Sequence, residues 1–226
     1  MKYTWLLFDA DDTLFDFSKA ESNALMWSME QAGLQFQPEY ARVYAQFNQQ
    51  VWQEFERGLV TSQELRVKRF RLFFDDVNLQ TDPFHFSQLY LHNLGLGTDL
   101  LEDANEVVHD LKTRFRIALV TNGLMDVQIP RLQGSTLHDC FEQVFISEVI
   151  GSAKPSRIFF EAVFEKLGQP AKNEVLIIGD SLSSDIKGGI DFGIDTCWYN
   201  PKRNSTNLPI AHQITRLKDL INILAS

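Results

Sequence analysis

WLLFDADDTLFD, residues 5–16, joins an apolar run directly to a cluster of aspartates. The run is short and continuously apolar, which is typical of a strand buried on both faces of a parallel sheet. Asp9, Asp11 and Asp12 follow at the point where that strand ends. In a parallel sheet with helices on both faces, ligands bind outside the carboxyl ends of the strands. The stretch therefore predicts a strand that delivers carboxylates to a binding edge.

Four more apolar runs repeat this pattern along the chain, and helix-length segments separate most of them. Strands that alternate with helices are typical of a parallel sheet with crossover connections. We therefore expect an α/β fold with a parallel sheet at its core. With the first run, TWLLF at 4–8, the expected strands are RIALV at 116–120, QVFIS at 143–147, EVLIIG at 174–179 and DTCWY at 195–199.

The long segment between the first two runs contains no convincing strand and carries several helix-start signals. Ser18 and Glu21 have the spacing of a capping box, in which two side chains satisfy free amide groups of the first turn. A small helical bundle is therefore expected at 16–95, inserted into a core of 1–15 and 96–226. The expected helix starts lie at Ser18, Pro38, Thr61 and after Pro83.

Composition and charge exclude several classes of protein. The 226 residues carry a formal net charge of -9, and no block of Lys and Arg is present to grip a nucleic-acid backbone. Cys140 and Cys197 form no CxxC pair, which argues against a disulfide framework and a zinc site and fits a reducing compartment. No signal peptide or membrane-spanning run is recognised. We expect a cytoplasmic protein, a monomer or small homo-oligomer, without nucleic-acid or membrane partners.

Polar residues also follow the other predicted strands. The second strand ends at Thr121 and Asn122, the third leads to Lys154, and the fourth ends at Asp180 with Asp185 shortly after it. Each of these alone is an ordinary turn or helix cap. Taken together they are more informative, because they follow successive strands, and the carboxyl ends of parallel strands share one edge of the sheet. The chain therefore predicts one site that combines carboxylates, a hydroxyl and a lysine.

This set of residues suits phosphoryl transfer. Asp9 at the strand tip is a usable nucleophile toward phosphorus, and Asp11 is placed to act as general acid and then base. Two unit charges 4 Å apart repel by about 4 kcal/mol at an effective dielectric of 20, so a dianionic phosphate needs a cation there. Mg²⁺ bound by Asp9 and Asp180 meets this need, with Mn²⁺ as a substitute. Lys154, together with Thr121 and Asn122, is expected to bind the phosphoryl group.

The four motifs DADDTLFD, TNG, Lys154-Pro155 and GDSLSSD resemble, in order, those of the haloacid dehalogenase superfamily. The resemblance implies a doubly wound, Rossmann-like core with an inserted α-helical cap, an aspartyl-phosphate mechanism and magnesium. It makes Asp9 the nucleophile, and Asp11 the acid and base and a metal ligand through its backbone carbonyl. It also makes Asp180 a metal ligand and Asp185 a carboxylate at or beside the metal site.

Closer in, the chain resembles the bacterial pyrimidine 5′-nucleotidases, which implies a small phosphate ester, a nucleoside 5′-monophosphate such as dUMP, UMP or dTMP, as substrate. Two stretches carry this resemblance, GGIDFGIDTCWYN at 188–200 and DADDTLFDF at 9–17, where Asp12 stands at a position that is Gly in many superfamily phosphatases. Ile150, in SEVIGSAKP, departs from the pattern without changing a proposed catalytic group. No base-binding residue is assigned.

Three other functions remain open at this point. A phosphatase for another small metabolite, such as phosphoglycolate or a sugar phosphate, would use the same residues. A 2-haloacid dehalogenase would share the nucleophile, but its chemistry needs neither the acid at Asp11 nor the metal at Asp180. A non-catalytic scaffold is expected to have lost Asp9 or Lys154, and both are present.

Overall fold

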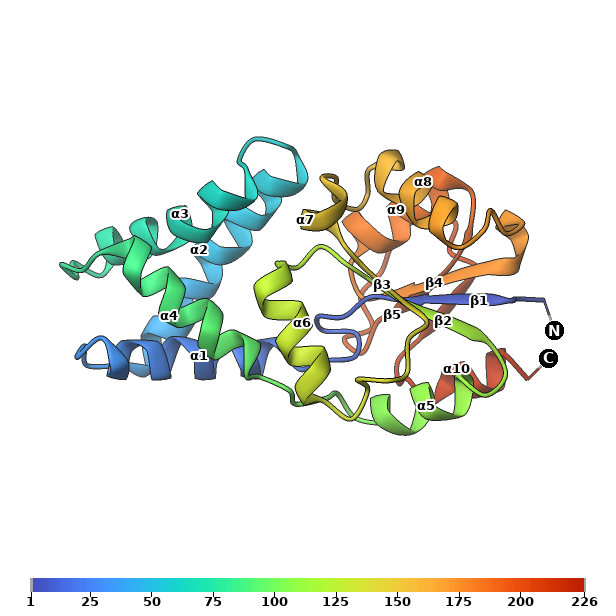
Figure 1. Ribbon diagram of the computed structural model, residues 1–226, viewed down its shortest axis with the longest axis horizontal. Coiled ribbons are helices and arrows are strands. Elements are labelled where there is room, and N and C mark those ends of the chain that lie inside the picture. Colours follow the sequence, from blue (N-terminus) through green and yellow to red (C-terminus); the bar gives the residue numbers. More distant parts are fainter. Residues whose placement is uncertain (1, 226) are drawn as a thin grey trace. The chain divides into compact units, whose positions relative to one another are not determined.

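The computed structural model describes residues 2–225, whose strands form one parallel sheet (Figure 1). The spatial order is β3-β2-β1-β4-β5-β6, and all neighbouring strands are parallel. This confirms the predicted fold class, a Rossmann-like parallel sheet. The strands are β1 (Trp5–Phe8), β2 (Arg116–Thr121), β3 (Gln143–Ile146), β4 (Val175–Gly179), β5 (Asp195–Tyr199) and β6 (His212–Ile214).

The first strand lies at the centre of the sheet. Trp5 of β1 pairs with Arg116 of β2 on one side and with Val175 of β4 on the other. From β1 the chain builds outward through β2 and β3, and it then returns to start the other half with β4. The strand order therefore reverses between β1 and β4, and the crevice outside such a reversal is the usual ligand site of open α/β sheets.

Helices cover both faces of the sheet, because successive strand residues point to opposite sides. Leu6 and Phe8 pack into the cluster that includes Val107 and Leu220. Trp5 and Leu7 pack into the other cluster, with Phe160. The helices on the first face are α5 (Ala104–Leu111) and α10 (Asp219–Ile223), and those on the second are α8 (Arg157–Lys166) and α9 (Lys187–Phe192) (Figure 1).

Short elements complete the core. The edge strand β6 was not predicted, because HQI is only three residues long and contains one apolar residue. The remaining short elements are α7 (Ser147–Ile150), the 3₁₀ turn η1 (Lys172–Glu174) and the π-helical turn η2 (Leu182–Ile186). Among residues 2–225, none of the helices combines the length and hydropathy that crossing a bilayer requires.

The described chain divides into two compact units. One, the core unit, holds the sheet and comprises 2–16, Asp99–Met125 and 132–225. The other, the helical unit, comprises Phe17–Thr98 and Asp126–Arg131, where the sequence predicted an insertion at 16–95. Its helices are α1 (Phe17–Gln31), α2 (Pro38–Glu56), α3 (Ser62–Asp76), α4 (Pro83–Gly95) and part of α6 (Met125–Gly134).

Two arginines explain why part of α6 groups with the helical unit. Arg66 of α3 forms a 2.6 Å ion pair with Asp126. The buried Arg131 donates from Nε to the backbone carbonyl of Gly97 at 3.0 Å. Neither contact is local in sequence, so spacing along the chain could not have revealed them.

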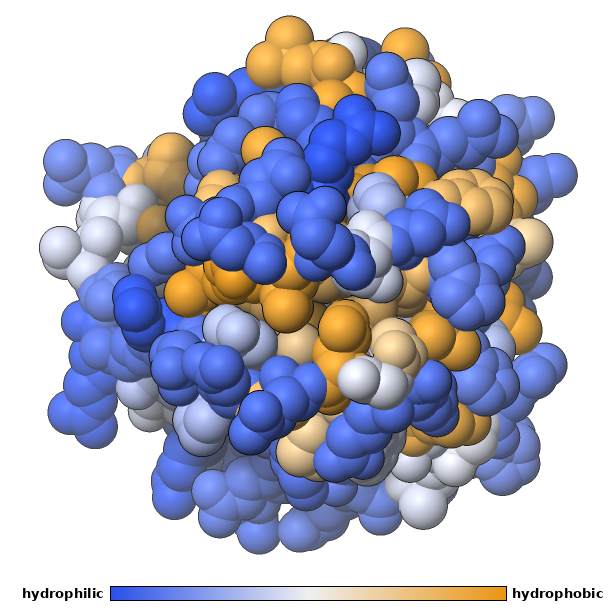
Figure 2. Space-filling model, turned by 90° about the vertical axis from the view of Figure 1, so that its left-hand side faces the viewer, coloured by the Kyte–Doolittle hydropathy of each residue, from blue (hydrophilic) through white to orange (hydrophobic). Residues whose placement is uncertain are grey.

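The interior of the helical unit is aromatic. Tyr44 of α2 stacks on Phe70 of α3, with ring centroids 5.2 Å apart, and meets Tyr90 of α4 at the same distance. Such aromatic pairs stabilise the folded state by more than the burial of their apolar area alone would. Leu59 and Phe84 are among the large apolar residues of this unit that are exposed. Figure 2 shows hydrophobic residues among hydrophilic ones on the face that it draws.

The helix starts of this unit were predicted with one error. Thr61 and Glu64 form the expected capping box of α3, and Pro38 opens α2 as its first residue. The capping box expected at Ser18 is wrong, because α1 begins at Phe17 and Ser18 lies inside its first turn. An N-cap residue must precede the helix.

Candidate active site

A buried lysine ties together the ends of three segments at the carboxyl edge of the sheet. The Nζ of Lys154 donates at 2.7 Å to Oδ1 of Asp9, to Oδ1 of Asp185 and to the backbone carbonyl of Val120. Only 1% of its side chain is exposed. All three protons of the ammonium therefore have acceptors, and two of these acceptors are carboxylates. Asp9, Lys154 and Asp185, which the sequence placed in one site, are brought together here.

Thr13 holds two of the predicted site residues in register. Its hydroxyl donates to Oδ2 of Asp9 at 3.2 Å and accepts the backbone N–H of Asp180 at 3.1 Å. Its side chain is fully buried. Sequence reasoning missed Thr13, although its place four residues after Asp9, in the turn that follows β1, was a usable signal.

Asp180 and Asp185 complete the carboxylate group. Carboxylate oxygens of Asp9, Asp180 and Asp185 all lie within 4.8 Å of one another. The backbone N–H of Ser181 donates to Oδ2 of Asp185 at 3.2 Å. A side chain at Gly179 would clash, because a Cβ there would meet Oδ2 of Asp185 at 2.2 Å. The glycine that ends β4 therefore makes room for the buried carboxylate.

Burial and mutual repulsion shift the ionisation of these groups. Burial raises the pKa of Asp9 to about 7: it outweighs the opposing effect of Lys154, and the charge of Asp185 adds to the rise. Burial, followed by the charge of Asp9, raises the pKa of Asp180 to about 8. Burial alone would lower the pKa of Lys154, but the charges of Asp185 and Asp9 raise it above its ordinary value. The lysine therefore stays charged, and the carboxylates favour an additional cation.

The residues that follow β2 support the lysine. The side-chain amide of Asn122 bonds to the backbone of Lys154 at both ends, accepting its N–H at 2.8 Å and donating to its carbonyl at 2.9 Å. The side chain thus fixes the segment that carries the lysine, and its predicted phosphate contact stays a prediction. The buried Thr121 hydroxyl accepts the N–H of Gly123 at 3.0 Å and shapes the same turn.

Asp11 and Asp12 lie in the tight turn after β1. The N–H of Asp12 donates to the carbonyl of Phe15 at 2.9 Å, and Asp12 has a φ of 56°. That left-handed conformation favours Gly, and Asp and Asn tolerate it better than most residues. The charge of Asp11 contributes to the raised pKa of Asp9, and both aspartates are partly exposed. The predicted acid–base role of Asp11 and its metal contact through the backbone stay predictions.

The donor set of this site fits a hard divalent cation. Three carboxylates face one ammonium, and their ligand atoms are close enough to share an ion. Mg²⁺ prefers carboxylate oxygens and keeps several waters. Asp9 and Asp180 are the residues that would hold the metal, because Asp185 is fully buried whereas Asp180 is partly exposed and Asp9 retains some exposure.

A parallel sheet that presents buried carboxylates and a lysine at its carboxyl edge defines an α/β enzyme, and comparison with known families identifies the class. The family model described as haloacid dehalogenase-like hydrolase matches residues 3–193. The chain belongs to this family of hydrolases. The resemblance drawn from the four sequence motifs is thereby confirmed.

Three bacterial relatives match over most of their lengths. The chain is 36% identical to the HAD-hydrolase YfnB of Bacillus subtilis, covering 99% of this chain and 96% of YfnB. It is 34% identical to the pyrimidine 5′-nucleotidase PynA of Streptococcus pneumoniae, with the same coverage. It is 32% identical to the pyrimidine 5′-nucleotidase YjjG of Escherichia coli, covering 88% and 87%.

A crystal structure of YfnB superimposes on the whole chain with a TM-score of 0.94 and 35% identity, and each chain is covered completely. That YfnB structure is described as bound to magnesium. Together with the relatives named as nucleotidases, these matches confirm the predicted enzyme class, a phosphoric monoester hydrolase resembling 5′-nucleotidases.

Proposed function

We propose that this chain is a magnesium-dependent phosphatase that hydrolyses nucleoside 5′-monophosphates, with pyrimidine nucleotides such as dUMP, UMP and dTMP as preferred substrates. The observation that carries the proposal is the Lys154 ammonium, held at 2.7 Å from both Asp9 and Asp185 beside Asp180. The names of PynA and YjjG support the choice of nucleotide. The proposal keeps the predicted cytoplasmic location and a monomer or small homo-oligomer.

Asp9 is the proposed nucleophile. One of its oxygens is held by Lys154 and the other by the Thr13 hydroxyl, so the carboxylate has a fixed orientation at the strand tip. An Asp9 oxygen attacks phosphorus and forms an aspartyl-phosphate while the bond from phosphorus to the ester oxygen breaks. Asp11 gives the departing alkoxide a proton. Asp11 then takes a proton from water, which attacks phosphorus, releases phosphate and restores Asp9.

The cations of the site stabilise the charge that develops on the phosphoryl oxygens. Lys154 supplies a positive charge whose position is fixed by three acceptors. Thr121 and backbone N–H groups of its turn are proposed to bind the phosphoryl group. Asp9 and Asp180 would hold magnesium, which would supply positive charge against the carboxylates and a Lewis acid for the phosphoryl oxygens. Mn²⁺ has the same preference for oxygen ligands and is proposed as a substitute.

Phosphate release by the purified protein with Mg²⁺ tests this function. The substrate panel comprises the uridine, deoxyuridine, thymidine and purine 5′-monophosphates, phosphoglycolate and a sugar phosphate, and an Asp9→Asn variant is the control. We expect preference for the pyrimidine nucleotides and loss of turnover in the variant. Turnover of only the other esters would keep the Asp9 chemistry and reject the nucleotidase. Turnover that survives in Asp9→Asn would reject the nucleophile.

A further inference from the structure

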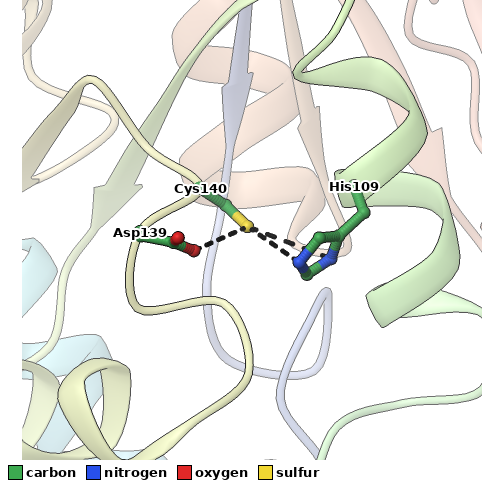
Figure 3. Close-up of side chains that lie close together, drawn as sticks. All are labelled: His109, Asp139 and Cys140. Carbon is green, nitrogen blue, oxygen red and sulfur yellow. Dashed lines mark hydrogen bonds between the residues drawn. The ribbon is translucent and has the colours of Figure 1, made fainter.

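The core unit holds a second group of metal-ligating side chains, and this group contains none of the proposed catalytic residues. Figure 3 shows His109 of α5 beside Asp139 and Cys140. Asp139 and Cys140 lie in the segment that leads into β3, and α5 leads into β2, so this group belongs to the amino-terminal edge of the sheet. The carboxylates of the candidate active site follow the opposite, carboxyl ends of the strands. The two groups are therefore independent.

The distances within the group match those between ligands of one tetrahedral zinc ion. Sγ of Cys140 lies 3.6 Å from Nε2 of His109 and 3.8 Å from Oδ1 of Asp139. Zinc binds sulfur at about 2.3 Å and nitrogen or oxygen at about 2.0–2.2 Å, so tetrahedral angles separate such ligands by about 3.5–3.6 Å. One ligand atom from each of the three residues lies within 4.8 Å of the other two.

A backbone carbonyl sets the tautomer of His109. Nδ1 of His109 lies 2.9 Å from the backbone carbonyl of Asn105. A carbonyl can only accept, so Nδ1 carries the proton and Nε2 keeps a lone pair for a metal. Sγ of Cys140 lies 3.9 Å from Nδ1 and 3.6 Å from Nε2, so the imidazole and the thiol must shift before both can bind one ion. A backbone carbonyl on the other ring nitrogen is the arrangement that fixes the tautomer of many metal-bound histidines.

Lys112 shows that the group already attracts a cation. Its Nζ lies 3.5 Å from Sγ of Cys140 and 3.6 Å from Oδ1 of Asp139. Its side chain is 30% exposed and ends a flexible four-carbon stem, so it can turn out into water. Lys112 therefore competes with a bound metal without blocking it permanently, and removing the ammonium should strengthen metal binding.

We propose that His109, Asp139 and Cys140 form a binding site for a thiophilic divalent transition metal, with zinc as the best fit. Sulfur and imidazole ligands suit zinc far better than magnesium, which prefers oxygen. The site would join the end of α5 to the segment before β3. Water completes the coordination, because the structure offers three protein ligands.

Cobalt absorption of the full chain in excess Mg²⁺ tests the proposal, because Co²⁺ replaces zinc and gives a sulfur-to-metal charge-transfer band only when a thiolate binds it. We expect this band to saturate at one equivalent of Co²⁺ and to disappear when Zn²⁺ is added. His109→Gln and Asp139→Asn keep the thiol and should each weaken Co²⁺ affinity by about 10-fold or more. Lys112→Met should tighten it.

Cys197→Ser is the matched control, since this second cysteine is buried in β5 and belongs to no such group among the described residues. The band should be unchanged in this variant and absent in Cys140→Ser, with far-ultraviolet circular dichroism confirming that each variant is folded. A missing band in the wild-type protein would overturn the site. A band insensitive to both His109→Gln and Asp139→Asn would overturn it as well, because a lone thiol would then be the ligand.

Discussion

The core unit and the helical unit each bury a cation, and the two cations are treated very differently. Lys154 and Arg69 both have about 1% of their surface exposed. Every N–H of the Lys154 ammonium has an acceptor, and two of the acceptors are carboxylates. Arg69 donates from Nη1 to Asn48 at 3.0 Å, while its Nε and Nη2 have no hydrogen-bond partner among the described residues.

Arg69 is held mainly by packing. Its guanidinium lies 5.1 Å from the ring centroid of Phe70 and 5.0 Å from that of Tyr90. The side-chain amide of Asn48 in turn donates a hydrogen bond to Glu21 at 2.6 Å. A buried charge is costly unless it is paired and hydrogen-bonded, and within the described chain only Lys154 of these two cations has an acceptor for every N–H. The contrast teaches that burial alone does not identify a functional cation.

Replacing each cation by methionine tests whether Lys154 is functional and Arg69 is not, and it should produce the largest effect. Lys154→Met should lower kcat/KM for the preferred nucleotide by about 10³-fold, because preorganised charge at the reacting group is lost. Arg69→Met should leave kcat/KM within about 2-fold, since it touches no proposed catalytic group. Steady-state kinetics with saturating Mg²⁺ measures both. Equal losses in the two variants would show that Lys154 acts only through stability.

Thr13 tests whether positioning matters as much as charge. Thr13→Val keeps the shape of the side chain and removes the hydroxyl that contacts Asp9 and the N–H of Asp180. We expect kcat to fall by about 10-fold to 100-fold, as for other groups that orient metal ligands. Mg²⁺ affinity from isothermal titration calorimetry should weaken in parallel. Unchanged kcat and Mg²⁺ affinity would restrict Thr13 to a packing role.

Much of the fold and of the candidate site could be predicted from the sequence, because short apolar runs indicate the strands and the polar residues that follow them indicate the strand ends. The apolar runs gave five of the strands, and the order of Asp9, Thr121, Lys154 and Asp180 along successive strands placed them at one edge. In a parallel sheet this needs no knowledge of long-range contacts. The short edge strand β6 was missed because few of its residues are apolar.

Contacts that depend on tertiary packing could not be predicted. Nothing in the sequence indicated that the Asn122 amide would bond to the backbone of Lys154, 32 positions away. The nearness of His109 to Cys140 was equally hidden, since no local motif links them. Sequence spacing reports on neighbours within an element, whereas these pairs arise only when separate elements pack together.

The protonation of Asp9 and Asp180 predicts a smaller effect, a gradual change of stability with pH. The folded-state pKa values, about 7 for Asp9 and about 8 for Asp180, lie above their ordinary value. The metal-free protein should therefore lose stability as pH rises from the ordinary pKa of 3.8 to about 8, because over this range the unfolded chain has released protons that the folded state still binds. Above about pH 8 the loss should level off. Mg²⁺ binds only the ionised carboxylates, so its stabilisation should grow as pH rises past the two folded-state pKa values.

Thermal unfolding with and without Mg²⁺ measures this effect. The rise in Tm on adding Mg²⁺ should be small near about pH 6 and several degrees larger near about pH 8.5. Asp180→Asn should make the effect of Mg²⁺ on Tm depend less on pH, because the variant lacks one carboxyl group with a raised pKa and one proposed metal ligand. A Mg²⁺ effect that is constant across this range would contradict the coupling between proton and metal.

The smallest expected effect is on the stability of the helical unit. Arg69→Met removes one hydrogen bond to Asn48 and two ring contacts, but it also removes a charge whose Nε and Nη2 are unpaired. An unsatisfied buried polar group costs about 1–3 kcal/mol, and replacing a buried charge by a well-packed apolar side chain is often neutral. The free energy of unfolding in urea should therefore change by less than about 1 kcal/mol. A loss above about 3 kcal/mol would mean that the Arg69 charge balances Glu21 through Asn48, in which case a Glu21→Gln, Arg69→Met double variant should recover most of it.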